Sequence, residues 1–199
     1  MNYFEVFGLE RTLVIDTGAL QRRFYELSRR YHPDFHHGAA AEEQARMLDA
    51  SARLNAAYRT LRDPIARIDY LIRLEEGRET KEGATVKPQA PPELLEEMFE
   101  IQEALAEAKT GGDLDPTVRT TLRRRRDRLL ERLREEEARL TGPLSTTWDA
   151  AGEPGRRTLL EAFKQGLAAR AYLRAVIDDL GQALGEEEGT GEHVTHHRD

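Results

Sequence analysis

The chain contains no cysteine, a single tryptophan and few aromatic residues, which make up 7% of the total. The absence of cysteine excludes disulfide bonds, thiolate metal ligands and a cysteine nucleophile. The scarcity of aromatic residues, together with 34% charged residues, disfavours a β-sandwich or barrel and favours amphipathic helices. The 199 residues include 39% hydrophobic residues, enough for one large or two small helical domains.

Two further features are missing from the sequence. No apolar run approaches the length of a membrane span, and the first residues lack the basic region and apolar core of a secretory signal. The net charge of -7 disfavours extensive nucleic-acid binding. We therefore expect a helical protein of the cytoplasm, with neither a membrane nor a nucleic acid as partner and with no cofactor.

Apolar residues recur with the spacing of a helix on both sides of the segment from Tyr31 to Phe35. These two apolar stripes predict an antiparallel helical hairpin. The first helix is expected over residues 17–31, capped by Asp16. Pro33 favours the turn because it lacks an N–H and restricts His32 to extended backbone. A short helical segment ending at Gly8 precedes the hairpin. The two stripes comprise Leu20, Phe24, Leu27 and Tyr31, then Met47, Ala50, Leu54, Tyr58 and Leu61.

The helix at residues 17–31 carries a basic face opposite its apolar stripe. This face comprises Arg22, Arg23, Arg29 and Arg30, with Tyr25 at its edge. A solvated face that happens to be basic is one interpretation. Its position beside the His32-Pro33-Asp34 loop favours the other, an electrostatic docking face for an acidic partner.

The order of these segments resembles a J domain. The resemblance rests on the basic helix, the His32-Pro33-Asp34 loop, and the runs Leu54-Asn55-Ala56-Ala57-Tyr58 and Leu61-Arg62-Asp63-Pro64. J-domain proteins dock on DnaK-type ATPase chaperones, stimulate ATP hydrolysis and deliver a client. The resemblance therefore implies a stimulating loop and a docking face, comprising His32, Pro33 and Asp34, then Arg22, Arg23, Tyr25, Arg29 and Arg30.

A metal site or a catalytic base is the rival interpretation of His32, because His36 and His37 follow closely. Three imidazoles on a polar loop lack the fourth ligand and the supporting shell of a zinc site. The sequence also shows no nucleophile or paired acid near them. We therefore expect neither a metal nor enzymatic activity.

The second half of the chain predicts three helices after a linker rich in proline and glycine at residues 76–92. A helix at 64–74 precedes that linker. The bundle helices are expected over 93–108, from Asp115-Pro116 or Thr117 to Gly142-Pro143, and over 156–184, with Trp148 packing the last connection back onto the bundle. Tyr172 and Val176 are expected outside the core stripe of the last helix, and residues 185–199 to be disordered.

An apolar pair, Leu95 and Phe99, lies beside an acidic row on the first of these helices. The pair either packs under a neighbouring helix or forms a protein-binding surface. The second bundle helix carries the run from Arg123 to Arg128, which could contact nucleic acid. Self-pairing with the following glutamates is the favoured interpretation of that run.

A J domain, a short linker and a three-helix bundle together resemble the HscB-type co-chaperones of iron–sulfur cluster assembly. The run from Met1 to Leu9 and the segment from Leu94 to Leu105 carry the likeness. The resemblance implies an IscU-type scaffold as client and a DnaK/HscA-type chaperone as partner. The implied client-binding residues are Leu95, Glu96, Phe99, Glu100, Glu103, Glu107 and Tyr172. Glu96, where the family commonly has an apolar residue, and Gln102 depart from the pattern.

We thus predict an all-α protein with a J domain at 1–75, a linker at 76–92, a client-binding three-helix bundle at 93–184 and a tail at 185–199. The predicted function is that of a co-chaperone that stimulates a chaperone ATPase and delivers an iron–sulfur scaffold. A general DnaJ-like co-chaperone with another client remains the first alternative. A helical nucleic-acid-binding protein remains the second.

Overall fold

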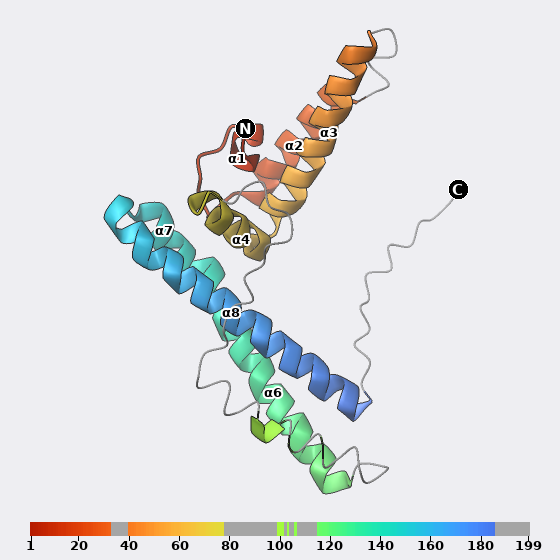
Figure 1. The fold of residues 1–199 in the computed structure, drawn as a ribbon, viewed down its shortest axis with the longest axis vertical. Helices are drawn as coiled ribbons and strands as arrows, with labels where there is room; N and C mark the ends of the chain where they lie inside the picture. Colours follow the sequence, from red (N-terminus) through yellow and green to blue (C-terminus); the bar gives the residue numbers. More distant parts are fainter. Residues whose placement is uncertain (33–39, 78–98, 102, 104–105, 107–114, 186–199) are drawn as a thin grey trace, which may run out of the picture. The chain divides into compact units, whose positions relative to one another are not determined.

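The computed structural model describes residues 1–32, 40–77, 99–101, 103, 106 and 115–185 (Figure 1). Within these ranges every regular element is helical and no strand occurs, so the predicted all-α class is confirmed. The helices are α1 (Tyr3–Phe7), α2 (Thr17–Tyr31), α3 (Ala41–Arg62), α4 (Pro64–Glu75), α6 (Pro116–Arg139), a π-helical turn (Leu140–Leu144), α7 (Ser145–Ala150) and α8 (Glu153–Leu184). Of the helix predicted at 93–108, residues 99–101, 103 and 106 are described and helical.

Local side-chain caps explain where the first two helices begin. Asn2 and Glu5 form a reciprocal capping box at α1, and Gly8 ends that helix with a φ of 66°. Asp16 Oδ1 accepts hydrogen bonds from the backbone N–H groups of Gly18 and Ala19, at 2.8 and 3.0 Å. These contacts start α2 at Thr17, so the predicted bounds and cap are confirmed.

The α2–α3 hairpin forms as the two apolar stripes predict, and Figure 1 shows these helices side by side. Phe24 and Tyr58 stack across the hairpin with ring centroids 4.1 Å apart. Leu20, Leu27 and Leu54 are buried in the core cluster against which both rings pack. Apolar stripes of this kind stabilise a helix pair by removing hydrocarbon from water.

The chain divides into two compact units, each built from separate segments. The first comprises residues Met1–Pro88 and Glu137–Leu167, and the second comprises Gln89–Glu136 and Ala168–Asp199. Residues 137–167 thus group with the first segment, whereas the sequence led us to expect all of 93–184 in one bundle. The helices α6 and α8 each contribute residues to both units.

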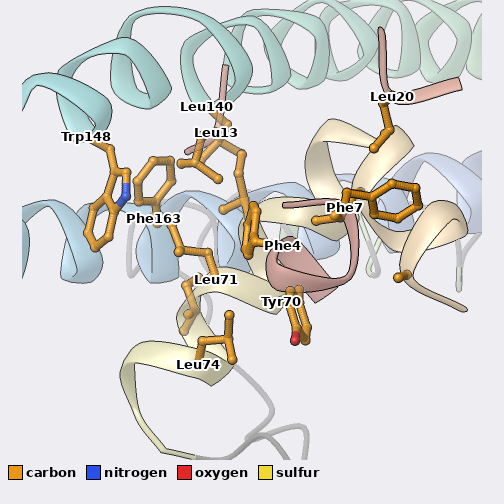
Figure 2. Close-up of a cluster of buried hydrophobic side chains, with 14 of the residues drawn as sticks. Phe4, Phe7, Leu13, Leu20, Tyr70, Leu71, Leu74, Leu140, Trp148 and Phe163 are labelled. Carbon is orange, nitrogen blue, oxygen red and sulfur yellow. The ribbon is translucent and has the colours of Figure 1, made fainter. Parts of the chain in front are cut away.

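The core of the first unit joins α1 and α4 to residues that follow α6 (Figure 2). Trp148 lies against Phe163 of α8 with ring centroids 6.0 Å apart. The sequence led us to expect that it packs onto the bundle, whereas it belongs to the core of the first unit. The same core also contains Phe4 and Leu71, which the sequence analysis did not pair with Trp148. Its buried members are Phe4, Phe7, Leu13, Leu20, Leu27, Leu54, Ala57, Leu61, Ile68, Tyr70, Leu71, Ile72, Leu74, Leu140, Trp148 and Phe163.

The core of the second unit is built from aliphatic side chains of α6, α8 and the helical segment at 99–101. Its buried members are Ile101, Leu122, Leu129, Leu173, Val176, Ile177, Leu180 and Leu184. The prediction that Val176 points away from the core is wrong, because only 4% of this residue is exposed. Tyr172 is half-buried and packs against the same cluster, so it is not fully outside the stripe either. The apolar stripe of α8 is wider than the sequence analysis assumed.

The predicted helix end at Gly142-Pro143 is also wrong. The chain stays helical from Pro116 to Ala150 and passes through a π-helical turn that contains Pro143. The wider turn accommodates the proline ring, and neighbouring hydroxyl groups donate to the main-chain carbonyls around it. Ser145 Oγ donates to the Leu140 carbonyl at 2.7 Å, and Thr147 Oγ1 donates to the Pro143 carbonyl at 2.8 Å. The last helix begins at Glu153 rather than at the predicted residue 156.

Candidate chaperone-docking and client-binding surfaces

The predicted docking face lies on the exposed side of α2. Arg22, Arg23, Arg29 and Arg30 are all exposed, and Tyr25 is 56% exposed. Arg23 forms an ion pair with Glu26 at 3.0 Å on the same helix. The guanidinium groups therefore offer several donors on one side of α2 for carboxylates of a partner.

The ends of α2 set the electrostatics of this face. Hydrogen bonds from the N–H groups of Ala19 and then Gly18 lower the pKa of Asp16, and Arg22 lowers it further. Asp16 therefore stays ionised at the positive end of the helix dipole. Arg29 and Arg30 lie in the last turn of α2, where cations stabilise the helix end. Two of the predicted docking residues thus also stabilise their own helix.

His32 ends α2 with φ -66° and ψ 131°, the extended backbone that a following proline imposes. Its side chain is exposed at the start of the predicted stimulating loop. Pro33 and Asp34 lie outside the described residues, as do His36 and His37. The role of the loop therefore stays a prediction.

Phe99 is the most informative residue of the predicted client-binding surface. It is 70% exposed, whereas Ile101, two residues further on the same helical segment, is 1% exposed. The alternative in which Phe99 packs under a neighbouring helix is wrong. Glu100 and Glu103 are exposed beside it, whereas Tyr172 of α8 is half-buried. Leu95, Glu96 and Glu107 lie outside the described residues, and the role of the surface stays a prediction.

The arginine-rich part of α6 has an ion pair that the sequence analysis missed. Arg125 Nη2 lies 3.7 Å from Glu100 Oε2, so a member of the predicted client surface is paired with α6. Arg134, which follows the run from Arg123 to Arg128, pairs with Glu131 at 3.3 Å on α6 itself. The first pair joins residues on separate helical segments, and helical periodicity within one segment contains no signal for it.

The described residues contain no cluster of His, Asp or Glu side chains that could hold a metal ion. Among the helices that the structure describes, none combines the length and the apolar character needed to cross a membrane.

The chain matches no protein-family model, but it is similar to solved structures over most of its length. The chaperone HscB from Vibrio cholerae is 26% identical, with 90% of this chain and 99% of that chain covered and a TM-score of 0.52. The human co-chaperone protein HscB is 23% identical, with 92% of this chain and 81% of that chain covered and a TM-score of 0.59. The likeness to the human protein concerns the fold, whereas the likeness to the Vibrio cholerae protein extends to the sequence. The resemblance to HscB-type co-chaperones is thereby confirmed, and the chain has the HscB-type fold of a J domain joined to a C-terminal helical bundle.

Proposed function

We propose that this protein is a cytoplasmic, non-enzymatic co-chaperone of iron–sulfur cluster assembly. Its J domain docks on a DnaK/HscA-type chaperone and stimulates ATP hydrolysis, while its second unit holds an IscU-type scaffold protein. The likeness to the Vibrio cholerae chaperone HscB, which covers nearly all of both chains, is the observation that carries this proposal.

Charge complementarity supports docking through α2. The exposed arginines can form paired hydrogen bonds with carboxylates of the chaperone. In the stimulating loop, Asp34 supplies acceptors, His32 supplies a donor and an acceptor, and Pro33 lowers the conformational entropy lost on docking. The J domain stimulates hydrolysis by binding the hydrolysis-competent state of the chaperone better than the other state, since a ligand shifts an equilibrium only through differential affinity.

The exposed Phe99 supports client binding by the second unit. An exposed aromatic ring surrounded by carboxylates is typical of a protein interaction site. Glu100 and Glu103 supply the charged rim, and Phe99 supplies the anchor that becomes buried in the complex. The same chain then brings activator and client to the chaperone together, which raises the effective concentration of each.

The test of this function is ATP turnover by a purified DnaK-type chaperone, with and without this protein and a purified IscU-type scaffold. We expect stimulation by the protein alone and a further, synergistic increase with the scaffold. Stimulation without any response to the scaffold would instead favour a general DnaJ-like co-chaperone with another client. No stimulation at all would refute the J-domain assignment.

Two variants with matched controls assign the surfaces. Asp34→Asn should abolish stimulation while scaffold binding persists, whereas Asp49→Asn, at an exposed carboxylate of α3, should leave both unchanged. Phe99→Ala should weaken scaffold binding by about 2 kcal/mol or more, as expected for an interface anchor. Val118→Ala, at another exposed apolar residue of the second unit, is its control and should bind the scaffold normally.

A further inference from the structure

Asp149 of α7 holds the segment that leads into the docking helix. Its two carboxylate oxygens accept hydrogen bonds from the backbone N–H groups of Leu13 and Val14, both at 2.8 Å. Leu13 and Val14 lie between α1 and α2 and belong to no helix. A carboxylate that accepts two main-chain N–H groups is a strong, directional contact. One side chain of α7 therefore fixes the backbone shortly before Asp16, the cap of α2.

The buried Arg67 of α4 contacts the same segment through the carbonyl of Leu13. Only 4% of Arg67 is exposed, and its guanidinium donates to the carbonyls of Leu61, at 2.7 Å, and Leu13. Burial lowers the pKa of Arg67, whereas the charges of Asp63 and Asp149 oppose that shift. Leu13 is thus held at its N–H by Asp149 and at its carbonyl by Arg67, and the two charged groups favour each other.

Lys164 of α8 makes a second charged contact, at the end of α4. Its Nζ lies 2.5 Å from Oε1 of Glu76, the residue that follows α4, and 2.8 Å from Oε1 of Glu161 on its own helix. The hydrogen bonds that Lys164 Nζ donates to these carboxylates, Glu161 first and Glu76 second, raise the pKa of Lys164. Both ends of the J-domain segment are therefore attached to the C-terminal helices, by Asp149 near the beginning and by Lys164 at the end.

These polar contacts are not required to hold the unit together. The aromatic and aliphatic core already joins α1 and α4 to Leu140, Trp148 and Phe163. Ion pairs near the surface contribute little net stability, since desolvation and side-chain entropy offset the attraction. Directional contacts instead fix geometry, which an apolar core defines less sharply. Fixed geometry matters in a protein that has to present two partners to each other.

We propose that Asp149 and Lys164 are positioning residues that clamp the J domain to α7 and α8, and that this clamp couples client binding to chaperone stimulation. The inference rests on the proposed co-chaperone function. The effective concentration of a tethered client at the chaperone depends on how narrowly the connection between the J domain and the C-terminal helices restricts the position of the client. Loss of these contacts therefore lowers the additional stimulation that the bound client causes, without changing either binding surface.

The test uses the full-length variants Asp149→Asn and Lys164→Met, singly and combined. Asparagine replaces one acceptor of Asp149 by a donor, and methionine removes the charge of Lys164 while keeping most of the length of its side chain. Scaffold affinity and stimulation by the co-chaperone alone should match the wild type. The additional stimulation by the scaffold should fall by roughly threefold or more in the double variant. Backbone N–H exchange at Leu13 and Val14 should accelerate in Asp149→Asn.

Matched controls remove nearby charges that do not reach the J domain. Glu153→Gln removes the charge of an exposed carboxylate of α8, and Glu161→Gln removes the negative charge that Lys164 contacts within its own helix while Glu76 remains available. Both should retain the full response to the scaffold.

The outcomes separate this inference from the function on which it rests. Unchanged synergy in the double variant would overturn the clamp while leaving the co-chaperone function intact. A parallel loss of scaffold binding, of stimulation by the co-chaperone alone and of thermal stability would also overturn the clamp, because that pattern indicates a merely structural role. A wild-type protein that shows no synergy would overturn the proposed delivery function, and the clamp with it.

Discussion

The two units of the molecule have cores of different chemistry. The first unit buries the aromatic rings of Phe4, Phe7, Tyr70, Trp148 and Phe163, whereas the buried residues of the second core are all aliphatic. Among the described residues, the buried polar or charged side chains also belong to the first unit, and they are Asn2, Arg67 and Ser145.

This difference follows from what each unit has to hold together. The first unit joins short helices such as α1 and α7, which are too short to be stable alone, to a loop and to longer helices. Large rings with defined contact geometries and hydrogen bonds to the loop fix such an irregular arrangement. The second unit packs residues of long helices, for which stripes of leucine, isoleucine and valine suffice.

The strongest test of the aromatic core is Trp148→Ala. Trp148 is 1% exposed and packs against Phe163, so its truncation should lower the free energy of unfolding by about 3–5 kcal/mol. Trp148→Phe should cost less, because the indole Nε1 has no hydrogen-bond partner among the described residues. Urea denaturation followed by far-UV circular dichroism measures both. Equal losses would show that a phenyl ring replaces none of the packing that the indole supplies.

Leu180→Ala applies the same test to the aliphatic core. Leu180 is fully buried, and its truncation should cost about 2–5 kcal/mol through lost burial and the cavity that remains. Gln182→Ala on the exposed side of α8 is the control and should be nearly neutral. A neutral Leu180→Ala, measured by thermal unfolding, would mean that the second core is loosely packed and that the comparison fails.

A smaller effect separates the inside of the second unit from its surface. Ile101→Val should cost about 0.5–1.5 kcal/mol, whereas Phe99→Ala should change stability by no more than about 0.5 kcal/mol. The reason is that Ile101 is 1% and Phe99 70% exposed. Denaturant midpoints of the two variants give the answer. The reverse order would place Phe99 in a core and remove the proposed client anchor.

The smallest effect concerns the ion pair between Lys164 and Glu76 in the first unit. The folded state raises the pKa of Lys164 above its ordinary value of 10.5, so the stability gained is fully present below that value. It is lost as the pH rises through the higher folded pKa. The difference in melting temperature between wild type and Lys164→Met should therefore shrink in this alkaline range. A difference independent of pH would attribute the effect of the substitution to packing.

Features set by neighbouring residues were predictable from the sequence. The stripes that contain Leu20 and Leu54, the cap at Asp16 and the helix that starts at Pro64 depend on spacing and on contacts within a few residues. The sequence left two interpretations of Phe99 open, and its exposed fraction of 70% in the structure decides between them.

Features set by distant residues were not predictable. The contact of Asp149 with Leu13, the ion pair of Arg125 with Glu100 and the shared core of Trp148 and Phe4 join segments far apart in the chain. Proline usually ends a helix, yet hydroxyl groups after Pro143 sustain the π-helical turn. The burial of Val176 depends on how wide a face its neighbours cover, which periodicity alone does not define.

The position of Trp148 also determines how the protein can be observed. It is the single tryptophan of the chain, and it is buried in the first core beside Phe163 and the guanidinium of Arg156, which lies 5.2 Å from its ring. Light absorbed selectively by tryptophan is therefore emitted from the first unit alone. A fluorescence melt follows that unit while circular dichroism follows every helix, so any gap between the two curves measures how independently the second unit unfolds.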